Sequence, residues 1–306
     1  MGSSTSSSAA TPNLYTSLSS LVGNTPLVRL NTLSTEQVHI YGKLEGHNPG
    51  GSVKDRAALS MIEGAQARGE LPPGTKLIEA TSGNTGIALA MIARSKGLSI
   101  ELVMPENSTA ERVQTMRAYG ATVTLTPAER TIEGSIDYAR AKVASGGYVM
   151  LNQFANPDNY LAHYRTTGPE IWRDTGGHIT HFVSSMGTTG TIMGTSRYLK
   201  EQSTEVQIVG VQPTEGSSIP GIRRWSPDYL PAIYEPNRVD TIIDVSQAEA
   251  TAMARRLATD EGVFAGMSSG GSATAAHKLA QTLETGLIVC IICDRGDRYL
   301  SSDLFA

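Results

Sequence analysis

Cysteine and lysine are scarce in this sequence, and long apolar runs are missing. Among 306 residues there are two cysteines, too few for the disulfide framework of a small secreted protein. The net charge of −4 does not suit a nucleic-acid-binding surface, which would be basic and clustered. No apolar run approaches the ~20 residues that cross a bilayer. We therefore expect a cytoplasmic protein that binds neither nucleic acid nor membrane.

The cysteines, Cys290 and Cys293, stand three residues apart on one apolar run that predicts a β-strand. Side chains at this spacing face opposite sides of a sheet, which argues against a shared disulfide or metal ion. We expect both cysteines to be buried and structural. His178 and His181 also stand three apart, but no further ligand cluster accompanies them, so no metal site is predicted.

Apolar, strand-like runs alternate with helical patterns along most of the chain. This alternation predicts an α/β fold with two domains, each a mostly parallel twisted sheet flanked by helices. The domains are expected at 13–157 and 158–306, with segment 13–47 packing on the other domain. Residues 1–12 are rich in serine and lack the features of a signal peptide, so we expect a flexible tail there.

The individual elements follow from the same patterns. Strands are predicted at Val38–Leu44, Leu77–Ala80, Ile100–Met104, Thr122–Leu125, Tyr148–Asn152, His181–Ser185, Val206–Gln212, Thr241–Val245 and Leu287–Cys293. Helices are predicted at Lys54–Arg68, Thr85–Lys96, Ala110–Tyr119, Ile132–Ala144, Asn159–Asp174, Thr189–Lys200, Gln247–Glu261 and Ser269–Leu283. Capping boxes are predicted for Ser108 with Glu111 and for Ser246 with Glu249.

Two loops rich in glycine and threonine each join a predicted strand to a predicted helix. They are Thr81–Gly86 and Gly187–Thr191. Glycines let backbone N–H groups approach an oxyanion, and the helix N-terminus adds partial positive charge. Neither loop matches the Walker A or dinucleotide-binding patterns. Each alone could be a plain turn or an anion site, but together they suit a ligand with two anionic groups.

Lys54 is one of only seven lysines, and it stands at the first turn of a predicted helix after a Pro/Gly loop. The positive end of a helix disfavours an ammonium group. An amine pushed towards neutrality can form a Schiff base and later act as a base. The alternative is a solvated lysine that pairs with Asp55. A further loop, Gly266–Gly271, also opens a helix, and there Ser268 or Ser269 could simply act as an N-cap.

Taken together, these segments resemble one family of enzymes. The matching segments, in order, are Asn48–Arg56, Thr81–Gly86, Gly187–Thr191 and Ser268–Gly271. They are similar to motifs of the pyridoxal-phosphate (PLP) enzymes of the tryptophan-synthase-β type, or fold type II. The resemblance extends from about Leu21 to Leu304 and is greatest to the cysteine synthases (O-acetylserine sulfhydrylases). Gly216–Trp225 and Ile292–Ser301 resemble the B form of these enzymes, which uses thiosulfate.

The resemblance implies a role for each matching residue around PLP, in the cleft between the domains. Lys54 would form the Schiff base, Asn84 would contact the phenolic oxygen, and Ser268 would face the pyridine nitrogen. The phosphate would be bound by Gly187, Thr188, Thr189, Gly190 and Thr191. The substrate carboxylate would be bound by Thr81, Ser82, Thr85 and Gln153.

The implied reaction is a β-replacement in a homodimer. It makes cysteine or S-sulfocysteine from O-acetylserine and sulfide or thiosulfate, through an α-aminoacrylate. Arg223 and Arg224 lie in the long loop 213–237, and two guanidinium groups suit the dianion thiosulfate. The alternative is that both arginines are solvated or bind the loop to the rest of the protein.

Other functions stay open at this point. The same fold serves serine and threonine dehydratases, cystathionine β-synthases and O-phosphoserine sulfhydrylases. A non-catalytic binding protein on this fold is opposed by the intact Lys54 and Ser268. A nicotinamide-dependent oxidoreductase is opposed by the missing dinucleotide-binding pattern.

Overall fold

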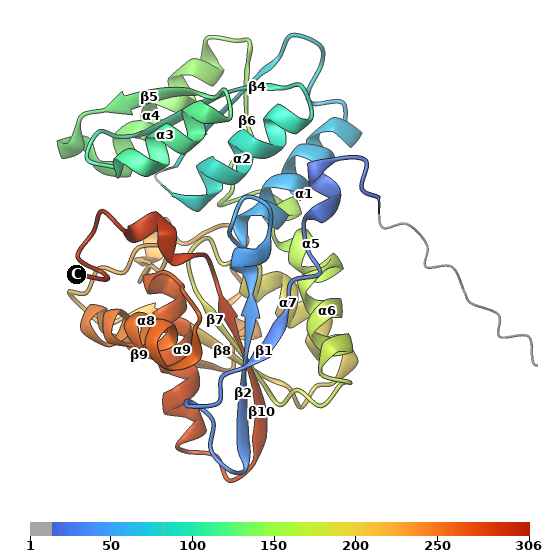
Figure 1. The fold of residues 1–306 in the computed structure, drawn as a ribbon. Coiled ribbons are helices and arrows are strands. Elements are labelled where there is room, and N and C mark those ends of the chain that lie inside the picture. Colours follow the sequence, from blue (N-terminus) through green and yellow to red (C-terminus); the bar gives the residue numbers. More distant parts are fainter. Residues whose placement is uncertain (1–13, 82) are drawn as a thin grey trace, which may run out of the picture.

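The computed structural model describes residues 14–81 and 83–306, so the predicted tail 1–12 and Ser82 lie outside the described residues. Its strands form a six-stranded sheet, β1-β2-β10-β7-β8-β9, and a four-stranded sheet, β5-β4-β3-β6. All neighbouring strands are parallel except β1 and β2. The two sheets belong to separate lobes, with the six-stranded sheet in the lower one in Figure 1. The predicted α/β class with parallel sheets is confirmed.

The bounds of the elements are as follows. The strands are β1 (Leu27–Arg29), β2 (Val38–Leu44), β3 (Lys76–Ala80), β4 (Ser99–Pro105), β5 (Thr122–Thr126), β6 (Tyr148–Met150), β7 (His181–Ser185), β8 (Gln207–Pro213), β9 (Thr241–Val245) and β10 (Gly286–Ile292). The α-helices are α1 (Lys54–Ala67), α2 (Asn84–Ser95), α3 (Ala110–Ala118), α4 (Thr131–Ala144), α5 (Pro157–Arg165), α6 (Thr167–Asp174), α7 (Gly190–Gln202), α8 (Gln247–Glu261) and α9 (Met267–Ala280). A short 3₁₀ helix, η6 (Gly296–Tyr299), follows β10.

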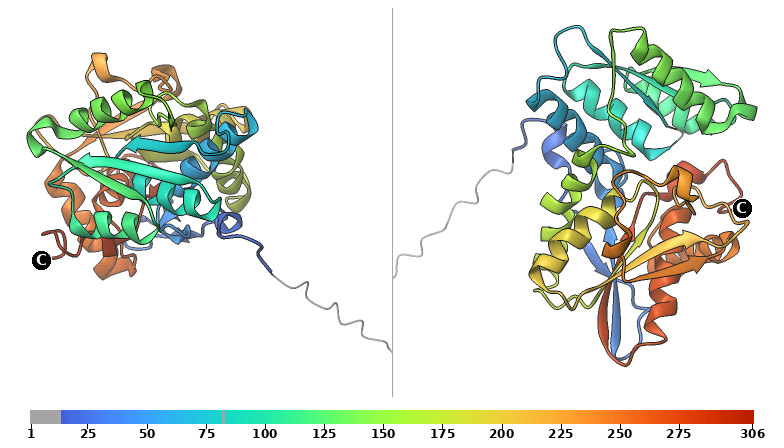
Figure 2. Two further views of the ribbon diagram at one scale, coloured as in Figure 1. Left: turned by 90° about the horizontal axis from the view of Figure 1, so that it is seen from above. Right: turned by 180° about the vertical axis from the view of Figure 1, so that it is seen from behind.

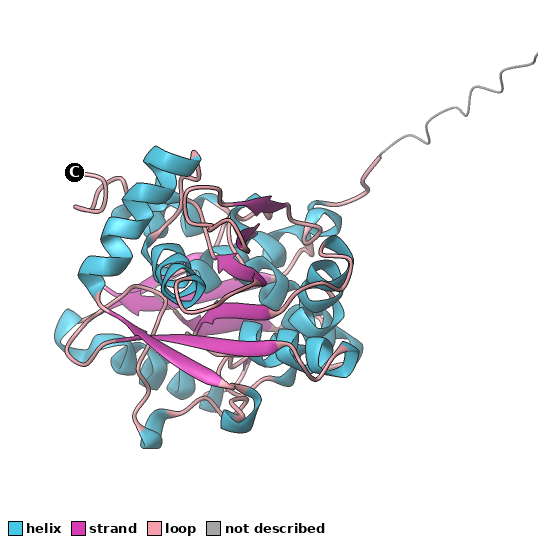
Figure 3. Cartoon of the chain, turned by 90° about the horizontal axis from the view of Figure 1, so that it is seen from below, coloured by secondary structure: helices cyan, strands magenta, loops and turns pink. Residues whose placement is uncertain are grey.

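Strand β10 shows how the large sheet is buried on both faces. Its alternate residues Ile288 and Cys290 join a core with α8 and α9, whereas Val289 and Ile291 join a core with α6 and α7. Figure 3 shows helices on both sides of the sheet. Burial on both faces explains why the strand is a continuous apolar run rather than an alternating one.

The small sheet is covered in the same way. Helices α1, α2 and α3 share one core with the side chains on one of its faces, and α4 packs on the other face. Nine consecutive residues of α2, from Thr85 to Ala93, are buried. This fits a helix that is apolar nearly all round and lies between other elements.

Chain segments from both ends of the sequence meet where the lobes face each other. Helix α5, which follows β6 of the small sheet, packs on α1 and α7. The segment after β10, including η6, lies on the part of the lower lobe that faces the upper lobe (Figures 1 and 2). Strands β1 and β2, from the start of the chain, belong to the same sheet as β10.

Three local predictions are wrong. The three-residue strand β1 has no counterpart among the predicted strands. The single helix predicted over Asn159–Asp174 is two helices, because Thr166 leaves the helical region (φ −128°, ψ −68°). The N-cap of α3 is Thr109 rather than Ser108, and it makes no side-chain capping bond. The capping box of Ser246 with Glu249 is confirmed.

Candidate active site

A buried network of charges holds the first turn of α1. The Arg56 guanidinium donates to Glu45 on one side and to Glu170 of α6 on the other, each at 2.7 Å. Lys43 adds a second cation 2.9 Å from Glu170. Burial alone would raise the pKa of Glu170, but bonds from Arg56 bring it down to about 2. A network of this kind fixes geometry because breaking any pair would leave an uncompensated buried charge.

Lys54 is the first residue of α1, and this end of the helix lies against the residues that follow β10. The backbone N–H of its neighbour Val53 donates to Cys293 O at 2.8 Å. Burial lowers the pKa of Lys54, and the nearby Cys293 and Asp294 only partly oppose the shift. The predicted direction is correct, with burial as the leading cause. The solvated Lys54–Asp55 pair is wrong, because the Asp55 carboxylate is buried and accepts from Gly50 N–H at 2.5 Å.

The loop after β7 has the form of an oxyanion cradle. Thr189 adopts a left-handed conformation (φ 69°), and its buried hydroxyl has no partner among the described residues. A Cβ on Gly187 would lie 2.6 Å from Gly221 O, and one on Gly190 would lie 2.0 Å from Asn159 Oδ1. The loop is thus shaped by close packing that only glycine allows. Thr188 and Thr191, in the same loop, are also buried.

The loop after β3 lies against the turn that follows β6. Thr85 Oγ1 donates to Gln153 Oε1 at 2.9 Å, and both side chains are buried. Thr81 is buried beside them in the same loop. Three of the four residues predicted to bind a substrate carboxylate are therefore described, and Ser82 is the one that lies outside the described residues.

Asn84, the first residue of α2, connects the two lobes. Its Nδ2 donates to Asp294 at 2.7 Å, and its Oδ1 accepts from Arg298 Nη1 at 2.5 Å. Arg298 Nη2 also donates to Gly50 O. The Tyr299 hydroxyl donates to the same Asp294 oxygen at 2.7 Å. The segment after β10 thus holds both the start of α2 and the loop before Lys54.

Ser268, near the start of α9, lies beside the thiol of Cys293. This contact acts on the pKa of Cys293, which burial raises to about 11. Cys290 and Cys293 are buried in different cores, on opposite faces of the large sheet. The prediction of two buried cysteines is confirmed, but Cys293 also lies next to Lys54, which the sequence did not indicate.

The contacts separate Arg223 from Arg224. Arg224 is bound to the body of the protein, donating to Pro213 O at 2.9 Å and pairing with Asp244 at 2.5 Å. Arg223 stacks its guanidinium 5.5 Å from the ring of Trp225. Trp225 donates to Gly187 O at 2.8 Å, which ties this part of the loop to the loop at Gly187–Thr191. For Arg224 the structure therefore favours the alternative, in which the side chain holds the loop.

His163 of α5 contacts the loop Gly187–Thr191 through Thr191. Its ring nitrogens lie 2.9 Å from Thr167 Oγ1 and 3.3 Å from Thr191 Oγ1. Burial lowers its pKa to about 3, so the ring is neutral and can serve both hydroxyls. His163 carried no recognisable local pattern in the sequence. Asp294 lies in the segment Ile292–Ser301 that resembles the B form, but no role was predicted for its side chain.

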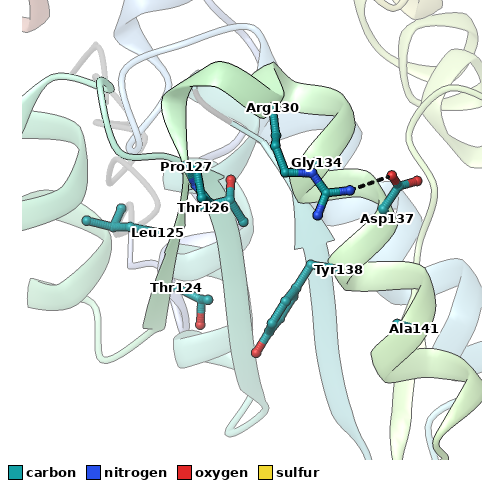
Figure 4. Close-up of a pocket in the computed structure, with 9 residues that line it drawn as sticks. All are labelled: Thr124, Leu125, Thr126, Pro127, Arg130, Gly134, Asp137, Tyr138 and Ala141. Carbon is teal, nitrogen blue, oxygen red and sulfur yellow. Dashed lines mark hydrogen bonds and ion pairs between the residues drawn. The ribbon is translucent and has the colours of Figure 1, made fainter.

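A pocket with a volume of about 420 Å³ lies between β5 and α4, away from the residues described above. Figure 4 shows Leu125 and Tyr138 on its sides and the Arg130–Asp137 ion pair at one end. It contains none of the predicted site residues. Among the described residues, no group of His, Cys, Asp or Glu side chains could hold a metal ion. Nor does any described helix combine the length and apolar character of a membrane span.

Comparison with protein families gives one match over most of the chain. Residues 18–294 match the model for pyridoxal-phosphate-dependent enzymes. All the predicted site residues lie inside that range.

Comparison with individual proteins agrees. The chain is 59% identical over 292 residues to cysteine synthase B of Pseudomonas aeruginosa, covering 95% of this chain and 98% of that protein. It is 57% identical over 289 residues to cysteine synthase B of Salmonella typhimurium, covering 94% and 95%. The crystal structure of a cysteine synthase from Entamoeba histolytica is similar with a TM-score of 0.91 and 36% identity, covering 99% of this chain and 94% of that one.

Proposed function

The chain belongs to the pyridoxal-phosphate-dependent enzymes, and on this basis we propose that it replaces the acetoxy group of O-acetylserine with sulfur. Its activity is the PLP-dependent formation of cysteine. The choice of O-acetylserine, the sulfur donor and the role of each residue are inferences from the site. The observation that carries them is Lys54, whose pKa is lowered by burial and which lies beside Cys293 and Asp294 just after β10.

The residues present fit PLP. The cradle at Gly187–Thr191 offers backbone N–H groups at the start of α7 and an unpartnered Thr189 hydroxyl, which suits a phosphate. Lys54 would hold the aldehyde carbon, and the neutral amine that this needs is favoured by burial. Ser268 would face the ring nitrogen, and Asn84 Nδ2 would donate to the phenolic oxygen.

The same residues can carry out the reaction. When bound, PLP supplies an electron-withdrawing ring that weakens the bonds at the substrate α-carbon. Thr81, Thr85 and Gln153 would bind the substrate carboxylate, with Ser82 as a fourth member of this group. Once released from the cofactor, Lys54 Nζ would take the α-proton and later return it. Acetate leaves from the β-carbon and the sulfur nucleophile adds there.

Ser268 would direct the chemistry towards elimination. A hydroxyl does not hold the ring nitrogen protonated as a carboxylate would, so it makes the ring a weaker electron sink. A long-lived carbanion is then disfavoured, and prompt loss of the β-substituent is favoured over transamination. Cys293 does not replace a carboxylate here, because its raised pKa keeps the thiol neutral.

Thiosulfate is the sulfur donor that the arginine loop favours. Arg223 lies next to Trp225, which is bonded to the cradle at Gly187. A guanidinium group beside the site suits a sulfonate better than a small sulfide ion. The role predicted for Arg224 is now one of holding the loop through Asp244.

A homodimer in the cytoplasm completes the proposal, with the chain divided into domains 13–157 and 158–306 and with segment 13–47 packing on the second of them. Residues 14–28 support the dimer, because large apolar side chains are exposed along them: Leu14, Tyr15, Leu18, Leu21 and Val28. Exposed apolar surface of this kind is typical of a protein interface.

The test is the visible absorption of the purified protein with PLP. O-acetylserine should shift the band of the bound cofactor, and thiosulfate should restore it with release of S-sulfocysteine. A shift with O-phosphoserine but not with O-acetylserine would overturn the proposed first substrate. If sulfide restores the original absorption band and thiosulfate does not, the proposed sulfur donor is wrong.

A further inference from the structure

Glu79 is a fully buried carboxylate without an ion-pair partner among the described residues. It lies on β3, two residues before Thr81, and only 3% of its surface is exposed. Both oxygens accept backbone N–H groups, from Asn152 at 3.0 Å and from Gln153 at 3.4 Å. Burial raises its pKa to about 7. Burying a carboxyl group lowers the stability of the fold unless hydrogen bonds compensate for the lost water. The contacts of Glu79 are therefore the place to look for its role.

The turn that Glu79 holds is the point at which the chain leaves the small sheet. Residues 151–156 connect β6 to α5, which packs in the other lobe. Asn152 has a left-handed conformation (φ 56°), which is uncommon for a residue other than glycine. The backbone N–H groups of Asn152 and Gln153 therefore point to one side together, and Glu79 receives both.

Gln153 is held by two further hydrogen bonds. Its carbonyl accepts from Asn159 Nδ2 at 2.7 Å, and its side chain accepts from Thr85 at 2.9 Å. Asn159 Nδ2 also lies 3.1 Å from Thr188 Oγ1 in the phosphate cradle. The loops Thr81–Gly86 and Gly187–Thr191 are thus both connected to this one turn. Glu79 anchors the turn to the small sheet.

We propose that Glu79 is a positioning residue for the reaction, which fixes the Asn152–Gln153 turn so that the Gln153 carboxamide is correctly placed for the substrate carboxylate. The inference rests on the proposed function, because it assumes that Gln153 binds that carboxylate. Glu79 itself touches neither the substrate nor the cofactor. It acts on the binding of the amino acid and has no part in the chemistry that follows.

Above pH 7 the ionised form of Glu79 suits this task, because its two oxygens supply an acceptor for each of the two N–H donors. A glutamine in its place offers one acceptor and one donor, so one backbone N–H would face an N–H₂ group. An unsatisfied buried donor is unfavourable. The turn would relax to avoid the clash, and Gln153 would move with it.

The test compares Glu79→Gln with Glu101→Gln in the holoenzyme. Glu101 is a good control because it is a buried carboxylate on the adjacent strand β4, bonded to Thr124 and away from the proposed site. E79Q should raise the KM for O-acetylserine about tenfold or more, with kcat at saturating substrate and PLP content nearly unchanged. E101Q should leave KM unchanged. If E79Q does not fold, E79D takes its place, and it should raise KM in the same way because its carboxylate is set back by one methylene.

Gln153→Ala separates the two levels of the argument. If Q153A raises KM but E79Q does not, Glu79 has no positioning role and the carboxylate site stands. If neither variant raises KM, both the carboxylate site and the role of Glu79 are wrong. A lower melting temperature or PLP content in E79Q with an unchanged KM shows that Glu79 is only structural and overturns the proposal.

Discussion

At the scale of single residues, Lys54 is placed where an amine is hard to keep charged. Replacing it with alanine should reduce turnover by at least about 100-fold, since the proposed base for the α-proton is lost. The cofactor-free protein should be equally stable or more stable, because a buried amine is removed from the fold. Steady-state kinetics and urea unfolding test both parts. Turnover close to that of the unsubstituted chain would show that Lys54 does not act on substrate.

The two neighbouring arginines give a matched pair of variants. Arg223→Ala should lower kcat/KM for thiosulfate about tenfold and should change kcat/KM for sulfide little. The expected loss is at the low end of what a hydrogen bond to a charged group contributes, because Arg223 is exposed. Arg224→Ala should affect the two donors equally, since it only releases the bond to Asp244. Parallel assays with both sulfur donors decide this. Equal losses in R223A would contradict a role in choosing the donor.

The site residues that the sequence predicts lie in short glycine-rich motifs at helix starts, such as Lys54 and Thr188. Their chemistry is local, so spacing alone is informative. Glu79, His163 and Asp294 were not predicted, because each acts through partners that are distant in sequence. Asp294, for example, meets Asn84 across 210 residues. No local pattern distinguishes such a side chain from an ordinary surface charge.

At the scale of elements, α5 and α7 are linked by a histidine that must stay neutral. The pKa of His163 falls from 6.5 to about 3 on folding, because of burial. The neutral ring is therefore favoured in the folded state, and its contribution to stability is present above pH 6.5 and lost as the pH falls below it. Between pH 6.5 and about pH 5 the loss should reach about 2 kcal/mol.

His163→Gln isolates this contribution, because an amide keeps a donor and an acceptor but does not titrate. Urea unfolding of both proteins at about pH 7.5 and pH 5 should show a smaller loss of stability for H163Q. An identical loss in both proteins would mean that other groups cause the acid sensitivity.

Element boundaries were predicted well where a side-chain period exists and poorly where it does not. Strands β2, β7 and β9 and helix α8 have the predicted bounds, since each has a clear apolar pattern. The break at Thr166 was missed although Pro169 gives a physical signal for it. Proline has no N–H to donate to Arg165, so one continuous helix cannot pass through this position undisturbed. Strand β1 is too short to show any period.

At the scale of the whole molecule, Arg298 connects the lobes through Asn84 and Gly50. Arg298→Met should destabilise the start of α2 by about 2 kcal/mol, as expected for a charged hydrogen bond to a partly buried partner. Hydrogen exchange in the first turn of α2 should become faster.

Arg295→Met is the control, because Arg295 lies in the same segment but, among the described residues, its ion pair is with the nearby Asp297. It should leave exchange in α2 unchanged. If hydrogen exchange in α2 becomes faster to the same extent in R295M and R298M, the segment after β10 as a whole holds the lobes together, rather than the Arg298 contact.

The pairing of β2 with β10 has a consequence for synthesis on the ribosome. Strand β2 is complete at residue 44, but its neighbour β10 begins only at residue 286. The small sheet, by contrast, is built from residues 76–150 without interruption. It can therefore form as soon as these residues have been made, whereas the hairpin of β1 and β2 has no neighbouring strand to join in the large sheet until β10 has been made. Of the strands in the large sheet, the one that holds this hairpin is the last to be synthesised.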